Sequence, residues 1–208
     1  MMPHKEEHAD SNCSKAIIDF INYTSVKIKK LSTFTQRIQA FRTLCLEDQT
    51  ALMRRAGLDV LLLKSIMDSI NPVTKQLELP PCNLQSLKLL GVDSRPHEAF
   101  IQAIDPTCFL DKNIALISCA VALFSSDRAN FVHREVIEKK QESYKSLLRR
   151  YLHSVYAEFE AESMYTNMMQ KLTEATRATE SFRGVPLKVD TACFENLFGT
   201  LSNTDLEG

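Results

Sequence analysis

The feature that most constrains the fold is one apolar stripe in the first quarter of the chain. Between residues 15 and 44, mostly apolar side chains recur at intervals of three and four: Ile17, Phe20, Ile21, Thr24, Ile28, Leu31, Phe34, Ile38, Phe41 and Leu44. This spacing places them on one face of a helix with 3.6 residues per turn. The stripe therefore predicts one long amphipathic helix over 15–44, whose apolar face packs against other elements.

The rest of the chain continues the helical pattern. A second helix is predicted over 48–69, with Asp48 as its cap, and it is apolar nearly all round, as expected of a central helix. Prolines and a glycine interrupt the helical pattern over 70–96, which predicts loops and a small β-hairpin within 70–95. Further helices are predicted over 96–104, 111–125, 132–157, 161–181 and 191–201. Only 5 glycines and 7 prolines occur in 208 residues, which favours an all-α fold.

Charge and hydropathy exclude several classes of protein. The formal net charge of -1 argues against broad electrostatic binding to nucleic acid or an anionic membrane. No apolar run approaches the roughly 20 residues that span a bilayer. The polar N-terminus is unlike a signal peptide, so we expect a protein of the nucleus or cytoplasm.

The cysteines and histidines show no spacing typical of a metal site. We therefore expect reduced cysteines and neither a metal nor another cofactor. His133 and His153 are isolated, and no carboxylate pattern pairs with either. We expect no catalytic residues, and hence a protein that is not an enzyme.

Four motifs resemble, in order and spacing, those of nuclear hormone receptor ligand-binding domains. The first is Phe41-x-x-Leu44-x-x-x-Asp48-Gln49-x-x-Leu52-Met53, at the join of the first two predicted helices. The others are the turn at 123–128, the pair Gln141 and Tyr144, and residues 168–172, followed by 193–198 in the place of the activation helix. The amino-acid sequence of these motifs is similar to that of the vitamin D receptor, xenobiotic receptor and invertebrate hormone-receptor-like group. Asp48 and Gln49 are expected to hold the helix join together.

The resemblance implies a three-layer antiparallel helical sandwich. It would occupy residues 14–202 without a recognisable first helix, between a disordered stretch over 1–13 and a tail over 203–208. No DNA-binding domain is recognisable in this chain, so DNA would be reached only through a missing domain or a partner.

The resemblance also implies a function in the nucleus, and possible residence in the cytoplasm as well. A lipophilic ligand (a sterol, a fatty acid or a xenobiotic) would control transcription through coregulators bearing an L-x-x-L-L motif. A retinoid X receptor-like partner would bind helix 161–181 and the helix before it. The methionines Met164, Met168 and Met169 would serve either that interface or the core.

The family pattern assigns two sets of site residues. The ligand would be bound by Tyr23, Thr24, Lys27, Leu61, Lys64, Ser65, Asp68, Tyr165 and Phe198. Lys64 would either hold a ligand oxygen or form an ion pair with Asp68, four residues later. The coregulator groove would be formed by Gln36, Arg37, Arg54, Phe194, Glu195, Asn196 and Leu197.

This chain departs from the family in the groove. Gln36 stands where the family has a lysine and Asn196 where it has a glutamate, whereas Arg54 matches a basic residue of the groove. An alternative function is therefore a ligand-independent dimerisation or adaptor domain, with a filled pocket and weak or altered coactivator binding.

Overall fold

The computed structural model describes residues 26–27, 29–78, 88, 93–126 and 130–183. These residues are almost entirely helical, as the sequence predicts. The α-helices are α2 (Gln39–Arg42), α3 (Leu46–Asp68), α5 (Arg95–Ala103), α6 (Lys112–Leu123), α7 (Arg134–Val155) and α8 (Glu158–Arg183), with one 3-10 helix, η1 (Pro106–Phe109). Residues 26–27 and 29–36 are also helical.

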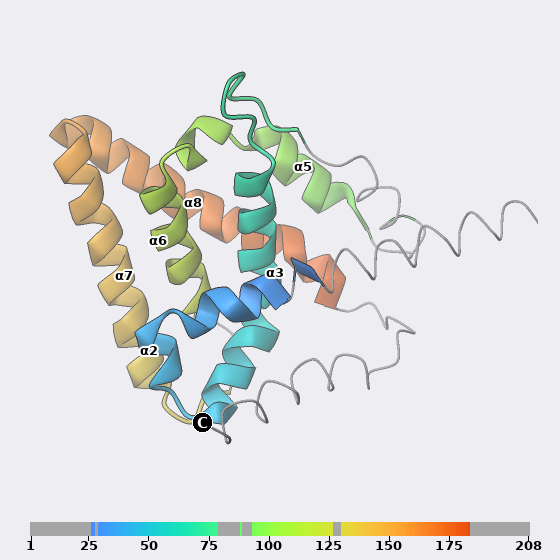
Figure 1. The fold of residues 1–208 in the computed structure, drawn as a ribbon, viewed down its shortest axis with the longest axis vertical. Coiled ribbons are helices and arrows are strands. Elements are labelled where there is room, and N and C mark those ends of the chain that lie inside the picture. The colour runs from blue at the N-terminus through green and yellow to red at the C-terminus, as the bar shows by residue number, and fades with distance from the viewer. Residues whose placement is uncertain (1–25, 28, 79–87, 89–92, 127–129, 184–208) are drawn as a thin grey trace, which may run out of the picture.

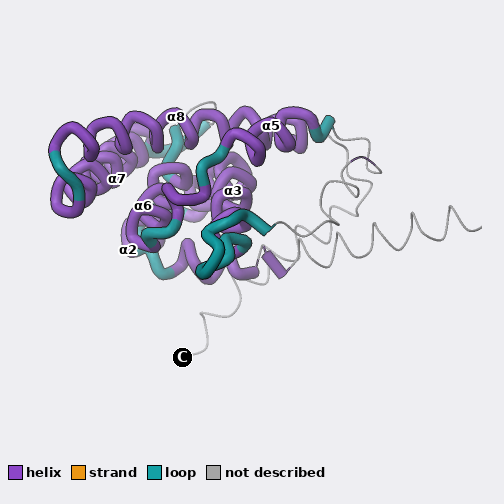
Figure 2. Tube along the Cα trace, turned by 90° about the horizontal axis from the view of Figure 1, so that it is seen from above, coloured by secondary structure: helices purple, strands orange, loops and turns teal. Residues whose placement is uncertain are grey.

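The helices are arranged in layers around α3 and α6. Seen from above, α8 and α5 lie along one side, α2 lies on the other side, and α3 and α6 lie between them (Figure 2). Helix α7 packs against α6 and α8, and α8 crosses behind α3 and α6 (Figure 1). The three-layer helical sandwich expected from the sequence is confirmed.

Helices α3 and α6 form the centre of the core; α6 is buried over most of its length, and α3 has buried residues along its whole length. The side chains of Leu52, Val60, Leu63 and Ile66 on α3 are fully buried, as are those of Ile114, Cys119 and Leu123 on α6. Helix α3 is in contact with α6, α8 and η1, so apolar residues on several of its sides have partners. This packing explains why the sequence of α3 lacks the narrow stripe of a surface helix.

The predicted helix over 15–44 is not continuous, because it is interrupted after Gln36 and resumes as the short helix α2. The backbone turns at Arg37 and Ile38, whose N–H groups donate to the carbonyls of Phe34 and Thr35 at 3.1 and 3.0 Å. The interruption redirects the chain into α2, and it brings Phe41 into the same buried cluster as Leu31. The residues over 15–25 lie outside the described part of the chain.

Most other predicted helix boundaries lie within a few residues of those in the structure. Two other predictions, the cap of the second helix and the hairpin, need correction. Helix α3 begins at Leu46, and its N-cap is Cys45 in an extended conformation, so Asp48 lies inside the first turn and is not the cap. The expected hairpin is reduced, among the described residues, to one antiparallel bridge between Ile70 and Leu77. Lys75 takes a left-handed conformation (φ 58°) in the intervening turn. The predicted helix over 191–201 lies outside the described residues.

None of the helices in the described residues is both long enough and apolar enough to cross a membrane.

Candidate functional site

Two polar side chains of the family-like motif, Asp48 and Gln49, fix the start of α3 to its neighbours. Gln49 Nε2 donates to the carbonyl of Leu44 at 2.9 Å. The fully buried Asp48 carboxylate accepts from the backbone N–H groups of Val132 and His133, at 2.7 and 3.0 Å. Burial alone would raise the pKa of Asp48, but these hydrogen bonds and those from the Cys45 and His133 side chains outweigh it, and the pKa is lowered. Gln49 therefore holds the join together, as expected, whereas Asp48 connects α3 to the segment that leads into α7.

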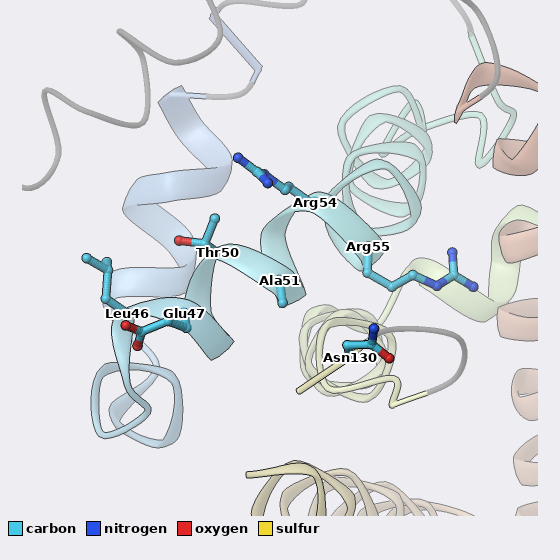
Figure 3. Close-up of a pocket in the computed structure, with 7 residues that line it drawn as sticks. All are labelled: Leu46, Glu47, Thr50, Ala51, Arg54, Arg55 and Asn130. Atoms are coloured by element: carbon cyan, nitrogen blue, oxygen red, sulfur yellow. The ribbon is translucent and has the colours of Figure 1, made fainter. Parts of the chain in front are cut away.

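An open groove of about 610 Å³ runs along the outer face of α3 (Figure 3). Leu46, Thr50 and Arg54 follow one another at intervals of four, so they form one row along the helix. The groove is lined by Leu46, Glu47, Thr50, Ala51, Arg54, Arg55 and Asn130. An acidic residue therefore lies near the first turn of α3 and a basic one two turns later, with apolar surface between them.

The two neighbouring arginines point in different directions. In the close-up, Arg54 projects away from the helix on one side of the groove and Arg55 on the other (Figure 3). Leu46 is 64% exposed, a high value for a leucine in the first turn of a central helix. The exposed Leu46 and Arg54 give the groove the chemistry to accept an amphipathic partner segment.

A second group of sequence-predicted residues lies at the other end of α3. Lys27 Nζ is 3.1 Å from Asp68 Oδ2, and the ammonium of Lys64 lies 5.5 Å from the ring centre of Phe34. The Lys64–Asp68 ion pair allowed by the sequence is thus replaced by a Lys27–Asp68 pair and a cation–π contact. Leu61 and Ser65 are half-buried on the same helix.

Of the other predicted ligand-binding residues, Tyr165 is described, and it lies apart from this group. Tyr165 lies in a separate groove of about 590 Å³ between α6, α7 and α8, where its ring is 5.9 Å from the Arg149 guanidinium. Tyr23, Thr24 and Phe198 lie outside the described residues.

Only some of the predicted coregulator residues lie within the described part of the chain. Arg54 lines the α3 groove, and Gln36 and Arg37 are exposed at the end of the preceding helix. The activation-helix residues Phe194, Glu195, Asn196 and Leu197 lie outside the described residues. Sequence reasoning missed Leu46, Glu47, Thr50 and Ala51, although the i, i+4 row that ends at Arg54 is visible in the sequence.

The remaining family-like motif residues connect α7 to α6. Gln141 Nε2 donates to the carbonyl of Val121 at 3.3 Å, and the ring of Tyr144 stacks on Phe124 with centroids 5.4 Å apart. Met168 is fully buried in α8, and Met164 and Met169 are half-buried against the core. Met168 is therefore a core residue, whereas Met169 also lines the groove beside Tyr165.

The amino-acid sequence of this chain is similar to those of known nuclear receptors. No protein-family model matches the chain. It is 34% identical over 196 residues, 90% of its length, to nuclear hormone receptor HR96 of Drosophila melanogaster. It is 35% identical over 120 residues, 55% of its length, to nuclear receptor ROR-beta of Mus musculus and of Homo sapiens. The chain spans about a quarter of the length of these relatives, 27% and 25% respectively.

A solved structure of the constitutive androstane receptor shares the fold, with a TM-score of 0.67 and 20% identity. The match covers 80% of this chain and 73% of that one. The relatives are nuclear receptors and give no indication of an enzyme.

Proposed function

Because this chain is homologous to nuclear hormone receptors and has the fold of their ligand-binding domain, we propose that it is a ligand-controlled regulator of transcription. It binds a small lipophilic molecule such as a sterol, fatty acid or xenobiotic, acts in the nucleus, and recruits coregulators. The observation that carries this proposal is the open groove along α3, with Leu46, Thr50 and Arg54 in one row.

The groove suits a short amphipathic helix of the L-x-x-L-L type. Leucines of such a helix would pack on Leu46 and Ala51, which are the apolar residues of the lining. Arg54 would face the carbonyl end of the bound helix and Glu47 its amide end, as the helix dipole requires. Gln36 and Asn196 replace the usual charged pair of the family, so we expect weaker binding than a lysine and a glutamate would give.

The experiment is a titration of the protein with a fluorescently labelled L-x-x-L-L peptide, followed by anisotropy. Arg54→Glu reverses the charge at one end of the groove and is expected to weaken binding about tenfold. Arg150→Glu on the exposed side of α7 makes the same charge change outside the groove and serves as the control. Equal affinities of the two variants would contradict binding in this groove.

The ligand site is proposed beside the α3 end that carries Leu61, Lys64, Ser65 and Asp68. Lys64 and the half-buried Lys27 offer hydrogen-bond donors there next to apolar side chains. Native mass spectrometry followed by denaturing extraction tests this directly. A stoichiometric lipid-like mass that leaves on denaturation supports a ligand pocket. Protein that carries no such mass, and whose melting temperature no sterol, fatty acid or xenobiotic raises, contradicts it.

A ligand-independent dimerisation or adaptor domain is the second candidate. The observation that favours it is that Asp68 is paired with Lys27 while Lys64 covers the Phe34 ring. The polar groups of the proposed pocket thus have partners within the protein, as in a filled pocket.

For either candidate we propose that α7 and α8 form the dimer face. A retinoid X receptor-like protein is the proposed partner, and DNA would be bound only through the partner or a further domain. Exposed apolar residues at the α7–α8 turn, Val155 and Phe159, supply contact surface for such an interface. Size-exclusion chromatography with light scattering, alone and with a retinoid X receptor domain, tests this arrangement.

A further inference from the structure

Three potential metal ligands meet where the start of α3 approaches the start of α7. They are the Cys45 thiol, the Asp48 carboxylate and the His133 imidazole, and their ligand atoms all lie within 4.8 Å of one another. Cys45 Sγ is 3.7 Å from His133 Nδ1, which is itself 3.1 Å from Asp48 Oδ2. Because 88 positions separate Cys45 from His133, their spacing in the sequence resembles no metal motif.

Two of the three separations agree with those around a tetrahedral zinc ion, and the third, between Cys45 Sγ and an Asp48 carboxylate oxygen, is within 4.8 Å. With Zn–S near 2.3 Å and Zn–N and Zn–O near 2.05 Å, tetrahedral angles put sulfur and nitrogen about 3.6 Å apart, and nitrogen and oxygen about 3.3 Å apart. The measured distances of 3.7 and 3.1 Å are each within a few tenths of an ångström of these values. Little movement of the side chains would be needed to admit the ion.

We propose that Cys45 Sγ, an Asp48 carboxylate oxygen and His133 Nδ1 bind one Zn²⁺ ion, with water as the fourth ligand. A thiolate, an imidazole and a carboxylate together suit Zn²⁺ better than Mg²⁺ or Ca²⁺, which prefer oxygen ligands alone. The His133 side chain is 56% exposed, so solvent and metal can reach the cluster, while the Asp48 side chain is 1% exposed and held in place.

Binding requires a defined exchange of protons. The Cys45 thiol releases its proton to solvent and binds as thiolate, and His133 binds as the neutral tautomer protonated on Nε2. The metal replaces the His133 Nδ1–Asp48 contact. The backbone N–H groups of Val132 and His133 still donate to the Asp48 carboxylate and orient it, as partners of metal-bound carboxylates commonly do.

The ion would connect two elements that are distant in the chain. Cys45 is the N-cap of α3 and His133 is the N-cap of α7, so the metal would tie the beginnings of these helices together. Leu46 and Glu47 of the α3 groove follow Cys45 directly. The site does not depend on coregulator binding, and it can be tested separately.

The test uses the full chain, reduced, stripped of metal with a chelator, and titrated with Zn²⁺ against a chromophoric competitor. Co²⁺ is added in a parallel experiment, because a thiolate ligand gives it a charge-transfer absorption in the near ultraviolet. We expect one equivalent of Zn²⁺ to bind and the thiolate–Co²⁺ band to appear. Cys45→Ser should abolish the band, and Cys45→Ser and His133→Ala should each weaken Zn²⁺ binding at least tenfold.

Matched controls are Cys108→Ser, on η1, and His153→Ala, on α7, which change the same residue types outside the cluster. Both should bind Zn²⁺ as the unsubstituted chain does. Absence of stoichiometric binding, or binding that survives both Cys45→Ser and His133→Ala, overturns the proposal. Should Cys45→Ser fail to fold, His133→Ala decides alone, because its side chain is mostly exposed.

Discussion

Helix α3 carries two buried aspartates, Asp48 in its first turn and Asp59 near its middle, and their carboxylates are stabilised differently. Asp48 accepts from the backbone N–H groups of Val132 and His133, and its pKa is lowered. Asp59 accepts from the hydroxyls of Thr176 and Thr179 on α8. Burial dominates its environment and raises the pKa of Asp59 despite those hydrogen bonds.

Both side chains have almost no exposed surface, 0% and 2%, but Asp59 lies deeper within the protein, so its carboxylate loses more hydration than that of Asp48. The hydrogen-bond donors differ as well. A backbone N–H in a fixed segment has no alternative acceptor, so its hydrogen bond to the carboxylate is retained. The single hydroxyl proton of Thr176 is shared between Asp59 and the carbonyl of Leu172, 3.2 Å away. The pKa of Asp59 is therefore raised by deep burial even though two hydroxyls and the nearby Arg55 favour its charged form.

The largest effect is expected when Asp48 is removed. Asp48→Ala leaves the N–H groups of Val132 and His133 without their acceptor, and should lower the free energy of unfolding by about 3 kcal/mol. Urea denaturation of the metal-free protein measures this change. His133→Ala keeps both backbone hydrogen bonds and should cost less than about 1 kcal/mol. Similar losses in the two variants would show that the side-chain contact, and not the backbone donors, stabilises Asp48.

The two aspartates should also act in opposite directions when the pH changes. Because the pKa of Asp48 is lowered by folding, its contribution to stability is present above the ordinary range of an aspartate and is lost as the pH falls. Because the pKa of Asp59 is raised, its contribution is present at low pH and is lost as the pH rises through the raised value.

Unfolding free energies measured across pH in the presence of a chelator separate the two contributions. Asp48→Asn should reduce the loss of stability in acid, and Asp59→Asn should reduce the loss that accompanies rising pH. If both variants change the dependence of the unfolding free energy on pH in the same pH range, the two aspartates do not have oppositely shifted pKa values.

The smallest effect is expected when Asp59 is made neutral at neutral pH. Asp59→Asn removes a charge whose burial is unfavourable, and the amide oxygen can still accept from one threonine. The free energy of unfolding should change by less than about 1 kcal/mol in thermal or urea melts. A loss as large as that of Asp48→Ala would show that the charge on Asp59 is fully compensated after all.

Local sequence patterns predicted much of this fold but few of its long-range polar contacts. The spacing of apolar residues located α3, α6, α7 and α8, because helical periodicity is a property of neighbouring residues. The same reasoning found the break near Leu44, between α2 and α3, but missed the earlier one at 37–38, where backbone turns interrupt an otherwise continuous apolar stripe.

In the candidate site, too, relations within one helix were predicted from the sequence and contacts between distant segments were not. Arg54 was found because a family motif fixes its distance from Asp48 along one helix. Asp68 was considered with Lys64, its neighbour by the i, i+4 rule, yet it pairs with Lys27, 41 positions away. The cluster of Cys45 and His133 depends on how the start of α7 approaches the start of α3, which no local pattern specifies.

Asp48 and Asp59 are 11 positions apart, which corresponds to three turns of helix and a remainder of about 20°. Their carboxylates therefore leave α3 on nearly the same side, about 16 Å apart along its axis. Thr50 and Arg54 project from the helix about 200° and 240° around from Asp48, on its far side. Two polar attachments to separate elements prevent α3 from rotating about its own axis or sliding along it. The angle at which the groove faces solvent is thus set partly by hydrogen bonds on the opposite side of the helix, together with the apolar packing of α3.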